Sequence, residues 1–248
     1  MSERLLVVAA MVLRAAGDLR EQEPDRRIGI VDIGTDHGYL PIYLVQQGFT
    51  GRMIAMDINE GPLERARNNV RQAGLLDRID LRRSDGFEQL LEGEAQIAVL
   101  SGMGGRLIQK MMTAHDPGEL GIRQLIVQPQ SEVRELWDFL RSRGWAVIGE
   151  RMVYEDEKFY TMMRSVREGE SAVSAEEDFG AILSAGRDET WHLFLEKEQA
   201  ANRVLIEKLE GENGPQDRIR ELSDRQANIE AALSVFRNAG SAMKQEDA

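Results

Sequence analysis

The sequence predicts an α/β fold followed by a small helical domain, and three observations carry this prediction. From Ile28 to Arg143, short apolar runs alternate with amphipathic stretches, which is the pattern of βαβ units in a mostly parallel sheet. Two further strand-like runs, Ala146–Tyr154 and Phe159–Val166, follow one another directly and predict an antiparallel hairpin at the edge of that sheet. Beyond residue 166 the pattern is helical.

The first element is an amphipathic helix rather than a signal peptide. Apolar residues recur at helical spacing behind Ser2, which would cap the helix: Leu5, Val8, Ala9, Val12 and Ala16. No apolar run approaches the ~18 residues that a membrane-spanning helix needs. We therefore expect a protein that does not enter the membrane.

Five parallel strands and five helices are expected in the α/β part. The strands are Ile28–Ile33, Arg52–Asp57, Ile79–Arg83, Ala95–Leu100 and Gln124–Val127. The helices between and after them are Leu40–Gln47, Pro62–Ala73, Phe87–Leu91, Leu107–Thr113 and Val133–Arg143. Gly144 would stop the last helix.

The remainder predicts a helical coiled-coil hairpin, so the expected domains are residues 1–166 and 167–248. A polar linker, Arg167–Ala175, comes first. One apolar stripe runs through Trp191, Leu195, Val204, Leu205 and Leu209, and a heptad pattern runs through Ile219, Leu222, Gln226, Ile229, Leu233 and Phe236. Gly211–Pro215 breaks the two helices apart. We expect these stripes to bury each other.

Composition and charge narrow the function. The chain has no cysteine and only three histidines, which excludes a disulfide framework, a thiolate nucleophile and a zinc-thiolate site and suits the cytoplasm. A net charge of −12 argues against coating nucleic acid by bulk electrostatics. A local basic surface is still possible in an arginine-rich stretch, which could be a solvated face or could contact phosphates. Its arginines are Arg65, Arg67, Arg71, Arg78, Arg82 and Arg83.

The turn after the first strand predicts a nucleoside site. Asp32, Gly34, Asp36 and Gly38 follow a buried strand and precede a helix, where an open α/β sheet presents its ligand crevice. The glycine spacing is not G-x-G-x-x-G, and two carboxylates would repel a pyrophosphate. A cationic nucleoside without phosphate fits better, and S-adenosylmethionine is such a molecule.

Two more strand ends offer acids on the same edge. Asp57 ends the second strand, where its carboxylate can accept hydrogen bonds from both ribose hydroxyls. Ser84-Asp85-Gly86 follows the third strand, and Asp85 can accept from the adenine amine. Each acid could also be a helix cap or turn residue.

The ends of the fourth and fifth strands lie beside this crevice. They read Ser101-Gly102-Met103-Gly104-Gly105 and Gln128-Pro129-Gln130, and we expect them to be loops in which glycine lets a flat substrate approach the backbone. Simple turn chemistry is the alternative.

Together these segments resemble the TrmK family of bacterial tRNA (adenine(22)-N(1))-methyltransferases. The resemblance rests on Asp32 to Pro41, Ala55 to Asn59 with Pro62-Leu63, Ser84-Asp85-Gly86, Gly102 to Gly105 and Gln128 to Gln130. It covers roughly residues 1 to 165, and the helical tail matches that family's C-terminal domain in kind. Asp36 replaces the middle glycine of the general D-x-G-x-G-x-G pattern, as it does in this family.

The resemblance implies a class I, Rossmann-like methyltransferase sheet, S-adenosylmethionine as donor and a D-loop adenosine of tRNA, position 22, as acceptor. It implies a donor site formed by Asp32, Gly34, Gly38, Asp57, Ile58, Ser84, Asp85, Gly86, Ser101 and Gly102. Substrate contacts would come from Met103, Gly104, Gly105, Gln128 and Pro129. Asp36, His37 and Tyr39 would be the catalytic residues, and no metal is expected.

The chemistry assigns these three residues different tasks. The N1 nitrogen of adenine has no proton to lose, so positioning and electrostatics suffice. Asp36 would accept from the exocyclic amine or face the developing charge, His37 would orient Asp36 or be structural, and Tyr39 rather than Tyr43 would stack on the base, unless it packs in the core. His115 and His192 are expected to be structural.

Two other functions stay open at this point. One is a methyltransferase for another RNA or a small molecule, and the other is a non-catalytic binding module built on the helical hairpin. A monomer is favoured.

Overall fold

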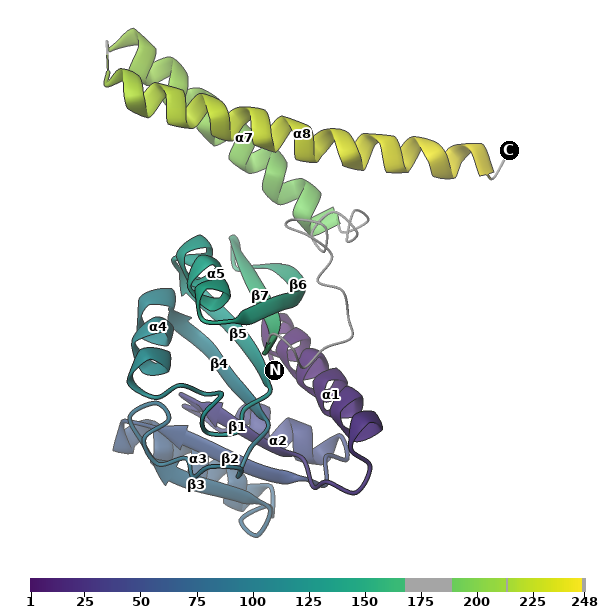
Figure 1. Cartoon of the computed structure of the whole chain (residues 1–248), viewed down its shortest axis with the longest axis vertical. Coiled ribbons are helices and arrows are strands. Elements are labelled where there is room, and N and C mark those ends of the chain that lie inside the picture. The colour runs from purple at the N-terminus through teal and green to yellow at the C-terminus, as the bar shows by residue number, and fades with distance from the viewer. Residues whose placement is uncertain (168–188, 213, 247–248) are drawn as a thin grey trace. The chain divides into compact units, whose positions relative to one another are not determined.

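The computed structural model describes the backbone of residues 1–167, 189–212 and 214–246, with side chains up to Ser234 in the last helix. The chain divides into two compact units, residues 1–175 and 176–248 (Figure 1). The expected linker, Arg167–Ala175, lies outside the described residues except for Arg167 itself.

The first unit is built on a seven-stranded sheet in the order β3-β2-β1-β4-β5-β7-β6. The strands are β1 (Gly29–Ile33), β2 (Arg52–Asp57), β3 (Ile79–Arg83), β4 (Ile97–Gly104), β5 (Gln124–Ser131), β6 (Trp145–Glu155) and β7 (Lys158–Arg167). The first five are parallel, whereas β7 is antiparallel to both β5 and β6. The expected parallel sheet with an antiparallel edge hairpin is therefore confirmed.

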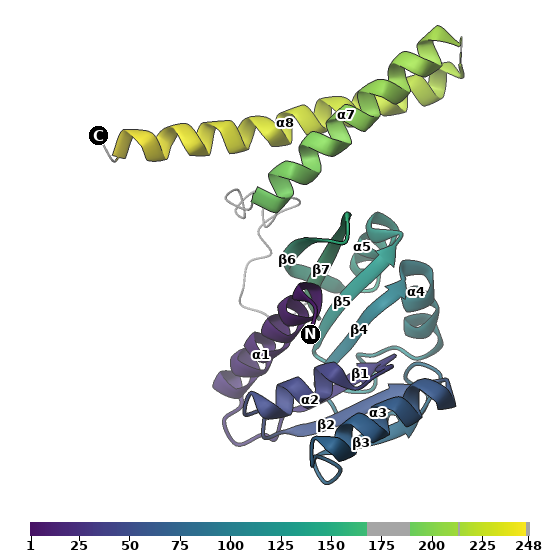
Figure 2. The ribbon, with the colours of Figure 1, turned by 180° about the vertical axis from the view of Figure 1, so that it is seen from behind.

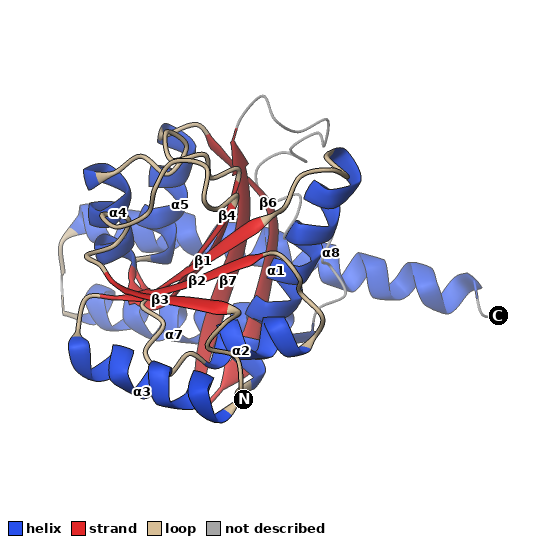
Figure 3. Ribbon diagram, turned by 90° about the horizontal axis from the view of Figure 1, so that it is seen from below, coloured by secondary structure: helices blue, strands red, loops and turns tan. Residues whose placement is uncertain are grey.

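Helices cover both faces of this sheet (Figure 3). They are α1 (Glu3–Gln22), α2 (Tyr39–Gln46), α3 (Glu60–Gln72), α4 (Gly105–Ala114) and α5 (Val133–Ser142). Residues of α1, α2 and α3 share one buried apolar cluster, and those of α4 and α5 share another. Because β1 pairs with β2 on one side and β4 on the other, the winding reverses between β1 and β4, and that switch point is where such sheets bind ligands.

Burial explains why the central strands read as continuous apolar runs. Every residue of β1 is buried, and so are the first four of β4, as expected for strands covered on both faces. The predicted cap of α1 is confirmed, since the Ser2 hydroxyl accepts a hydrogen bond from Leu5 N at 3.3 Å. Ser2 thus satisfies one of the free N–H groups of the first turn.

The glycine-rich ends of β4 and β5 were expected to be loops, and that prediction was wrong. Both strands continue, with Ser101 opposite Gln128 and Met103 opposite Pro129. The register shifts between these pairs, and Gly102, at φ +79, is the extra residue of the bulge. A glycine signal therefore marked a β-bulge here and not the end of pairing.

The expected helix at Phe87–Leu91 does not form, because residues 86–89 make a turn. Its apolar residues Phe87 and Leu90 are buried nonetheless. Ser84 organises the segment instead, since its hydroxyl donates to Gly86 O at 2.9 Å and accepts from Gln89 N at 3.1 Å. Five residues are too few to repay helix nucleation when a side chain supplies the turn.

The second unit is a pair of antiparallel helices, α7 (Glu189–Gly211) and α8 (Gln216–Glu246) (Figure 2). The predicted break at Gly211–Pro215 is confirmed. Leu195 packs with Ile229 and Leu233, as the heptad pattern predicted, and Leu222 is buried too. The side chain of Phe236 lies outside the described residues.

Part of the apolar stripe in α7 was assigned wrongly. Val204 is 65% exposed and Leu205 is 38% exposed, so neither belongs to the buried seam. The buried residue in this turn is Asn202, whose Nδ2 donates to Leu222 O at 2.8 Å and to Gln226 Oε1 at 3.0 Å. A polar residue at a seam position fixes helix register. Within the described residues, no helix is long and apolar enough to cross a membrane.

Candidate active site

A cavity of about 430 Å³ opens at the switch point between β1 and β4. Four segments line it. They are the end of β1 with the turn that follows it, from Asp32 to Leu40, the end of β4 at Ser101 and Gly102, Gln130 in β5, and the first turn of α1. The sequence-predicted residues Asp32, Gly34, Asp36, His37, Tyr39, Ser101 and Gly102 thus come together in one cavity.

Two glycines in the turn adopt left-handed backbone conformations that other residues rarely take, and both lie close to neighbouring side chains. A Cβ on Gly34 would lie 2.4 Å from Met103 Cε, and Gly34 has φ +79. A Cβ on Gly38, at φ +70, would lie 3.3 Å from Ala66 Cβ. Hydrogen bonds from the N–H groups of Gly34 and Thr35 to Met56 O, at 2.7 and 2.9 Å, fasten the turn to β2. The cavity floor is therefore rigid.

Asp32 is a buried acid beside the cavity. Asp32 is 5% exposed, and no lysine or arginine among the described residues forms an ion pair with it. Burial raises the pKa of Asp32 to about 6, the Thr35 hydroxyl beside it lowers this pKa, and the Asp57 carboxylate raises it. An unpaired, desolvated carboxylate of this kind is suited to a cationic ligand.

Asp36 stands at the mouth of the cavity in a left-handed conformation, φ 32. Arg65 Nη2 lies 2.7 Å from its Oδ1, and His37 Nε2 lies 3.4 Å from its Oδ2. Its side chain is 53% exposed. The strained backbone and the two partners fix a carboxylate that still faces solvent, an arrangement typical of functional sites.

Tyr39 is an exposed aromatic surface next to this acid. It is 53% exposed, and its ring stacks on His37 with centroids 5.1 Å apart and planes 8° apart. Tyr43 packs against the core instead. Tyr39 lines the cavity and Tyr43 does not, and the exposed ring can stack on a base, so the role predicted for Tyr39 stays a prediction.

The other predicted donor residues form a second part of the edge, outside this cavity, at the ends of β2 and β3. Asp57 is buried, and its Oδ1 accepts from Asn59 N at 2.8 Å. Ile58 is 48% exposed and Asp85 is also exposed. Gly86, at φ +57, packs on Met111, and the Ser84 hydroxyl is committed to the turn described above. Asp57, Ile58 and Asp85 therefore remain for a ligand, whereas Ser84 and Gly86 shape the loop.

Gln128 supports the cavity from behind. It is fully buried, and its Oε1 accepts from Ser101 Oγ at 3.2 Å and from Gly102 N at 3.0 Å. Its Nε2 donates to Pro129 O at 3.0 Å. Gln128 thus holds the β4 bulge in place and is not among the residues that line the cavity, and its predicted contact with the substrate stays a prediction.

Gly104 and Gly105 serve the packing of α4. A Cβ on Gly105 would lie 2.7 Å from Ser131 O, and a Cβ on Gly104 would lie 3.2 Å from Ser131 Oγ. Pro129 is buried. Met103 covers Gly34 with its methyl group. The structure thus places these four residues in the frame around the cavity rather than on its surface.

Ion pairs neutralise only part of the arginine-rich stretch, since Arg71, Arg78 and Arg83 bond to neutral oxygens. Arg82 is 20% exposed at its side chain and pairs with Asp80 and Glu94, each at 2.6 Å. Arg67 pairs with Glu64. Arg71, Arg78 and Arg83 donate to Asn68 Oδ1, Phe49 O and Ile58 O respectively.

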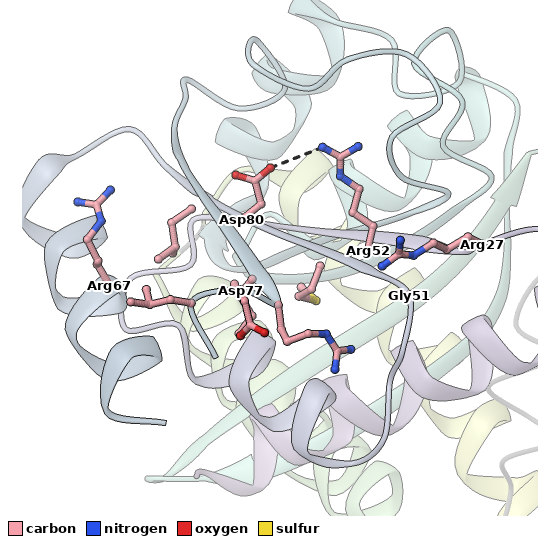
Figure 4. A pocket seen from close by; sticks show the side chains of 11 residues that line it. Arg27, Gly51, Arg52, Arg67, Asp77 and Asp80 are labelled. Atoms are coloured by element: carbon pink, nitrogen blue, oxygen red, sulfur yellow. Dashed lines mark ion pairs between the residues drawn. The ribbon is translucent and has the colours of Figure 1, made fainter. Parts of the chain in front are cut away.

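A second cavity, of about 540 Å³, lies at the opposite edge, where β2 and β3 begin (Figure 4). Arg27 and Arg52 border it together with Gly51, and Arg52 pairs with Asp80 at 3.6 Å and with Glu94 at 2.6 Å. Asp80 and Glu94 thus neutralise much of the positive charge at this cavity. The acid-lined cavity at the switch point is therefore the better candidate site.

Sequence reasoning missed one wall of that cavity. Met1, Ser2, Arg4 and Leu5 line it from the first turn of α1. They lie some thirty residues before the glycine turn, and their local pattern signals only a capped helix. Their place becomes visible only when α1 packs on the sheet.

The strand order, the switch-point cavity and its unpaired acid define a nucleoside-binding α/β enzyme of the class I methyltransferase type. The comparisons with known proteins agree. The model of the TrmK family, described as tRNA (adenine(22)-N(1))-methyltransferase, matches residues 30–231, and the chain belongs to this family.

Individual relatives support the assignment. The tRNA (adenine(22)-N(1))-methyltransferase of Bacillus subtilis is 35% identical over 179 residues, 72% of each chain. The crystal structure of the B. subtilis M1A22 tRNA methyltransferase TrmK superposes with a TM-score of 0.74 at 26% identity, covering 94% of this chain and 98% of that one. Streptococcus pneumoniae Sp1610 in complex with S-adenosyl-L-methionine gives 0.73 at 27% identity, covering 94% and 99%.

Proposed function

We propose that this protein transfers a methyl group from S-adenosylmethionine to N1 of adenosine 22 in the D-loop of tRNA. The observation that carries the proposal is the acid-lined cavity at the β1/β4 switch point of a TrmK-family sheet. Residues 1–166 would be the methyltransferase domain and residues 167–248 the helical domain. Action on tRNA implies a cytoplasmic location.

Residues at the carboxyl ends of β1, β2 and β3 fit different parts of the donor. Asp32, buried and without a cationic partner in the described part of the chain, suits a ligand that carries an ammonium and a sulfonium. Oδ1 of Asp57 accepts from Asn59 N, and the other carboxylate oxygen can accept from the ribose hydroxyls. Ile58 offers an exposed apolar surface to the adenine, and Asp85 an acceptor for its amine. The bound donor supplies an electrophilic methyl group on sulfur.

The chain's own residues then position the acceptor base. Tyr39 presents a ring on which a flipped adenine can stack, since its other neighbour is the parallel ring of His37. Asp36, held by Arg65 and His37, can accept a hydrogen bond from the exocyclic amine. Its negative charge also faces the positive charge that the adenine acquires as N1 is alkylated.

No proton transfer is required of these residues. N1 attacks with a lone pair, and the carbon–sulfur bond breaks with its electron pair left on sulfur. The adenine ring gains the positive charge that the sulfur loses. The site therefore works by orientation and electrostatics, which can supply on the order of 7 to 11 kcal/mol from proximity alone.

The test is methyl transfer from labelled S-adenosylmethionine to a tRNA transcript, beside the same transcript with A22 replaced by G. We expect incorporation only into the first, with the label mapped to N1. Asp36→Ala should lower the rate at least about 100-fold while the affinity for the donor stays within a few fold. Equal transfer to both transcripts would overturn the assignment of the acceptor.

A further inference from the structure

The first turn of α1 forms a wall of the candidate active site. Ser2, Arg4 and Leu5 line the same cavity as Asp32 and Gly102. Arg4 is the only lysine or arginine side chain among the described residues that line it. A guanidinium is thus placed at the margin of a cavity that also contains the acids Asp32 and Asp36.

This wall is held firmly. Ser2 caps the helix through Leu5 N, and Glu3 N donates to Glu155 Oε1 in the β6–β7 hairpin at 2.9 Å. One turn further on, Val8 and Val12 are fully buried in the core. The position of Arg4 is therefore fixed before any ligand arrives, which lowers the entropic cost of binding.

The charge of Arg4 is not neutralised. Its guanidinium lies 4.5 Å from the centroid of the Tyr160 ring, and no carboxylate in the described part of the chain forms an ion pair with it. Arg65, by contrast, is 2.7 Å from Asp36. An aromatic ring holds a guanidinium in place while its N–H groups stay available.

We infer that Arg4 binds the α-carboxylate of the donor's methionyl group. The inference rests on the proposed function. That group carries an ammonium and a carboxylate on one carbon, and the cavity offers a buried acid, Asp32, together with Arg4, the lining arginine that no described carboxylate neutralises. Arg4 is also only partly exposed and borders the same cavity as the switch-point residues Ser101 and Gly102, which favours the donor over a phosphate of the RNA outside.

The test removes the guanidinium from the protein and the carboxylate from the ligand, one at a time. Calorimetry measures the binding of S-adenosylmethionine and of decarboxylated S-adenosylmethionine to the full chain and to its Arg4→Met variant. We expect Arg4→Met to weaken S-adenosylmethionine about 10- to 100-fold, as for other charged hydrogen bonds. Decarboxylated S-adenosylmethionine should bind both proteins with the same, weaker affinity.

Arg14→Met is the matched control, because Arg14 lies in the same helix but borders a different cavity. It should leave both affinities unchanged, and thermal unfolding should show that both variants fold. Equal weakening of both ligands by Arg4→Met would overturn the inference, since Arg4 would then only shape the wall. An unchanged donor affinity with a raised KM for tRNA would also overturn it and assign Arg4 to a phosphate. If the unaltered protein bound neither ligand, the proposed function itself would fail.

Discussion

Arg65, in the second turn of α3, reaches Asp36 in the β1–α2 turn and donates from Nη2 to its Oδ1 at 2.7 Å. The two residues are 29 positions apart in the chain. Their contact joins the helix that follows β2 to the turn that follows β1. It orients a carboxylate that is otherwise half exposed.

Replacing Arg65 should therefore slow transfer without weakening the donor. For Arg65→Met we expect kcat to fall about tenfold, because a misdirected carboxylate loses its alignment with the base, and the Kd for S-adenosylmethionine to stay within twofold. Single-turnover methyl transfer and calorimetry measure the two quantities. Arg71→Met is the control, since Arg71 contacts Asn68 in the same helix. A similar loss in both variants would mean that α3 acts through its charge alone.

Donor affinity should depend on pH through Asp32. The pKa of this buried carboxyl is raised to about 6, and a cationic ligand binds the ionised form better. Affinity should thus be highest above pH 7 and fall as the pH drops through 6. Asp32→Asn should bind about tenfold more weakly at pH 7.5, roughly the loss of one charged interaction, with a flat profile between pH 5 and 7.5. Titrations across this range decide the matter, and an unaltered profile in the variant would assign the dependence to another group.

Stability should fall with rising pH through Glu150 in β6. Burial raises the pKa of Glu150 to about 7 from 4.5, so the folded state binds the proton more tightly than the unfolded state does. The free energy of unfolding should then decrease as the pH rises from 4.5 to 7, by up to about 3 kcal/mol. Glu150→Gln should remove most of the decrease between pH 6 and 7 in urea unfolding, whereas below pH 6 Asp32, whose pKa is also raised, contributes a decrease of the same sign. Glu88→Gln, at an exposed glutamate, should keep the whole decrease.

Gln128 should matter to the donor without touching it. Gln128→Ala removes the acceptor for Gly102 N and leaves buried groups unpaired, at a cost on the order of 2 kcal/mol. We expect a lower free energy of unfolding together with a several-fold weaker donor affinity. Urea unfolding and calorimetry on the same preparation test this. Loss of transfer with unchanged donor affinity and stability would instead place Gln128 at the substrate.

The sequence predicted most of the sheet because its strands are regular. β2 and β3 begin and end where the apolar pattern does. β4 and β5 run on through glycine and proline because a bulge at Gly102 lets pairing continue, and such a bulge has no distinct local signature. At Phe87–Leu91 the buried residues have helical spacing, but the chain there forms the turn held by Ser84.

The sequence predicted the part of the candidate site that one continuous segment of the chain supplies. The turn from Asp32 to Tyr39 lies together in the chain and in the cavity. Tertiary packing decided the rest. It turned Gln128 toward the bulge, paired Arg65 with Asp36, and brought Arg4 to the cavity from a helix whose own pattern shows only a core-facing side.

The bond between Glu3 N and Glu155 spans 152 positions, and Asp18 of the same helix pairs with Arg164 at 2.5 Å. During synthesis on the ribosome, α1 leaves the exit tunnel long before β6 and β7 exist. The first strands and α2 can cover most of its apolar side as they emerge, but these two polar contacts form only once the hairpin exists. A nascent chain that stops short of residue 155 would thus hold the glycine turn while the α1 wall of its cavity lacked the bond to Glu155.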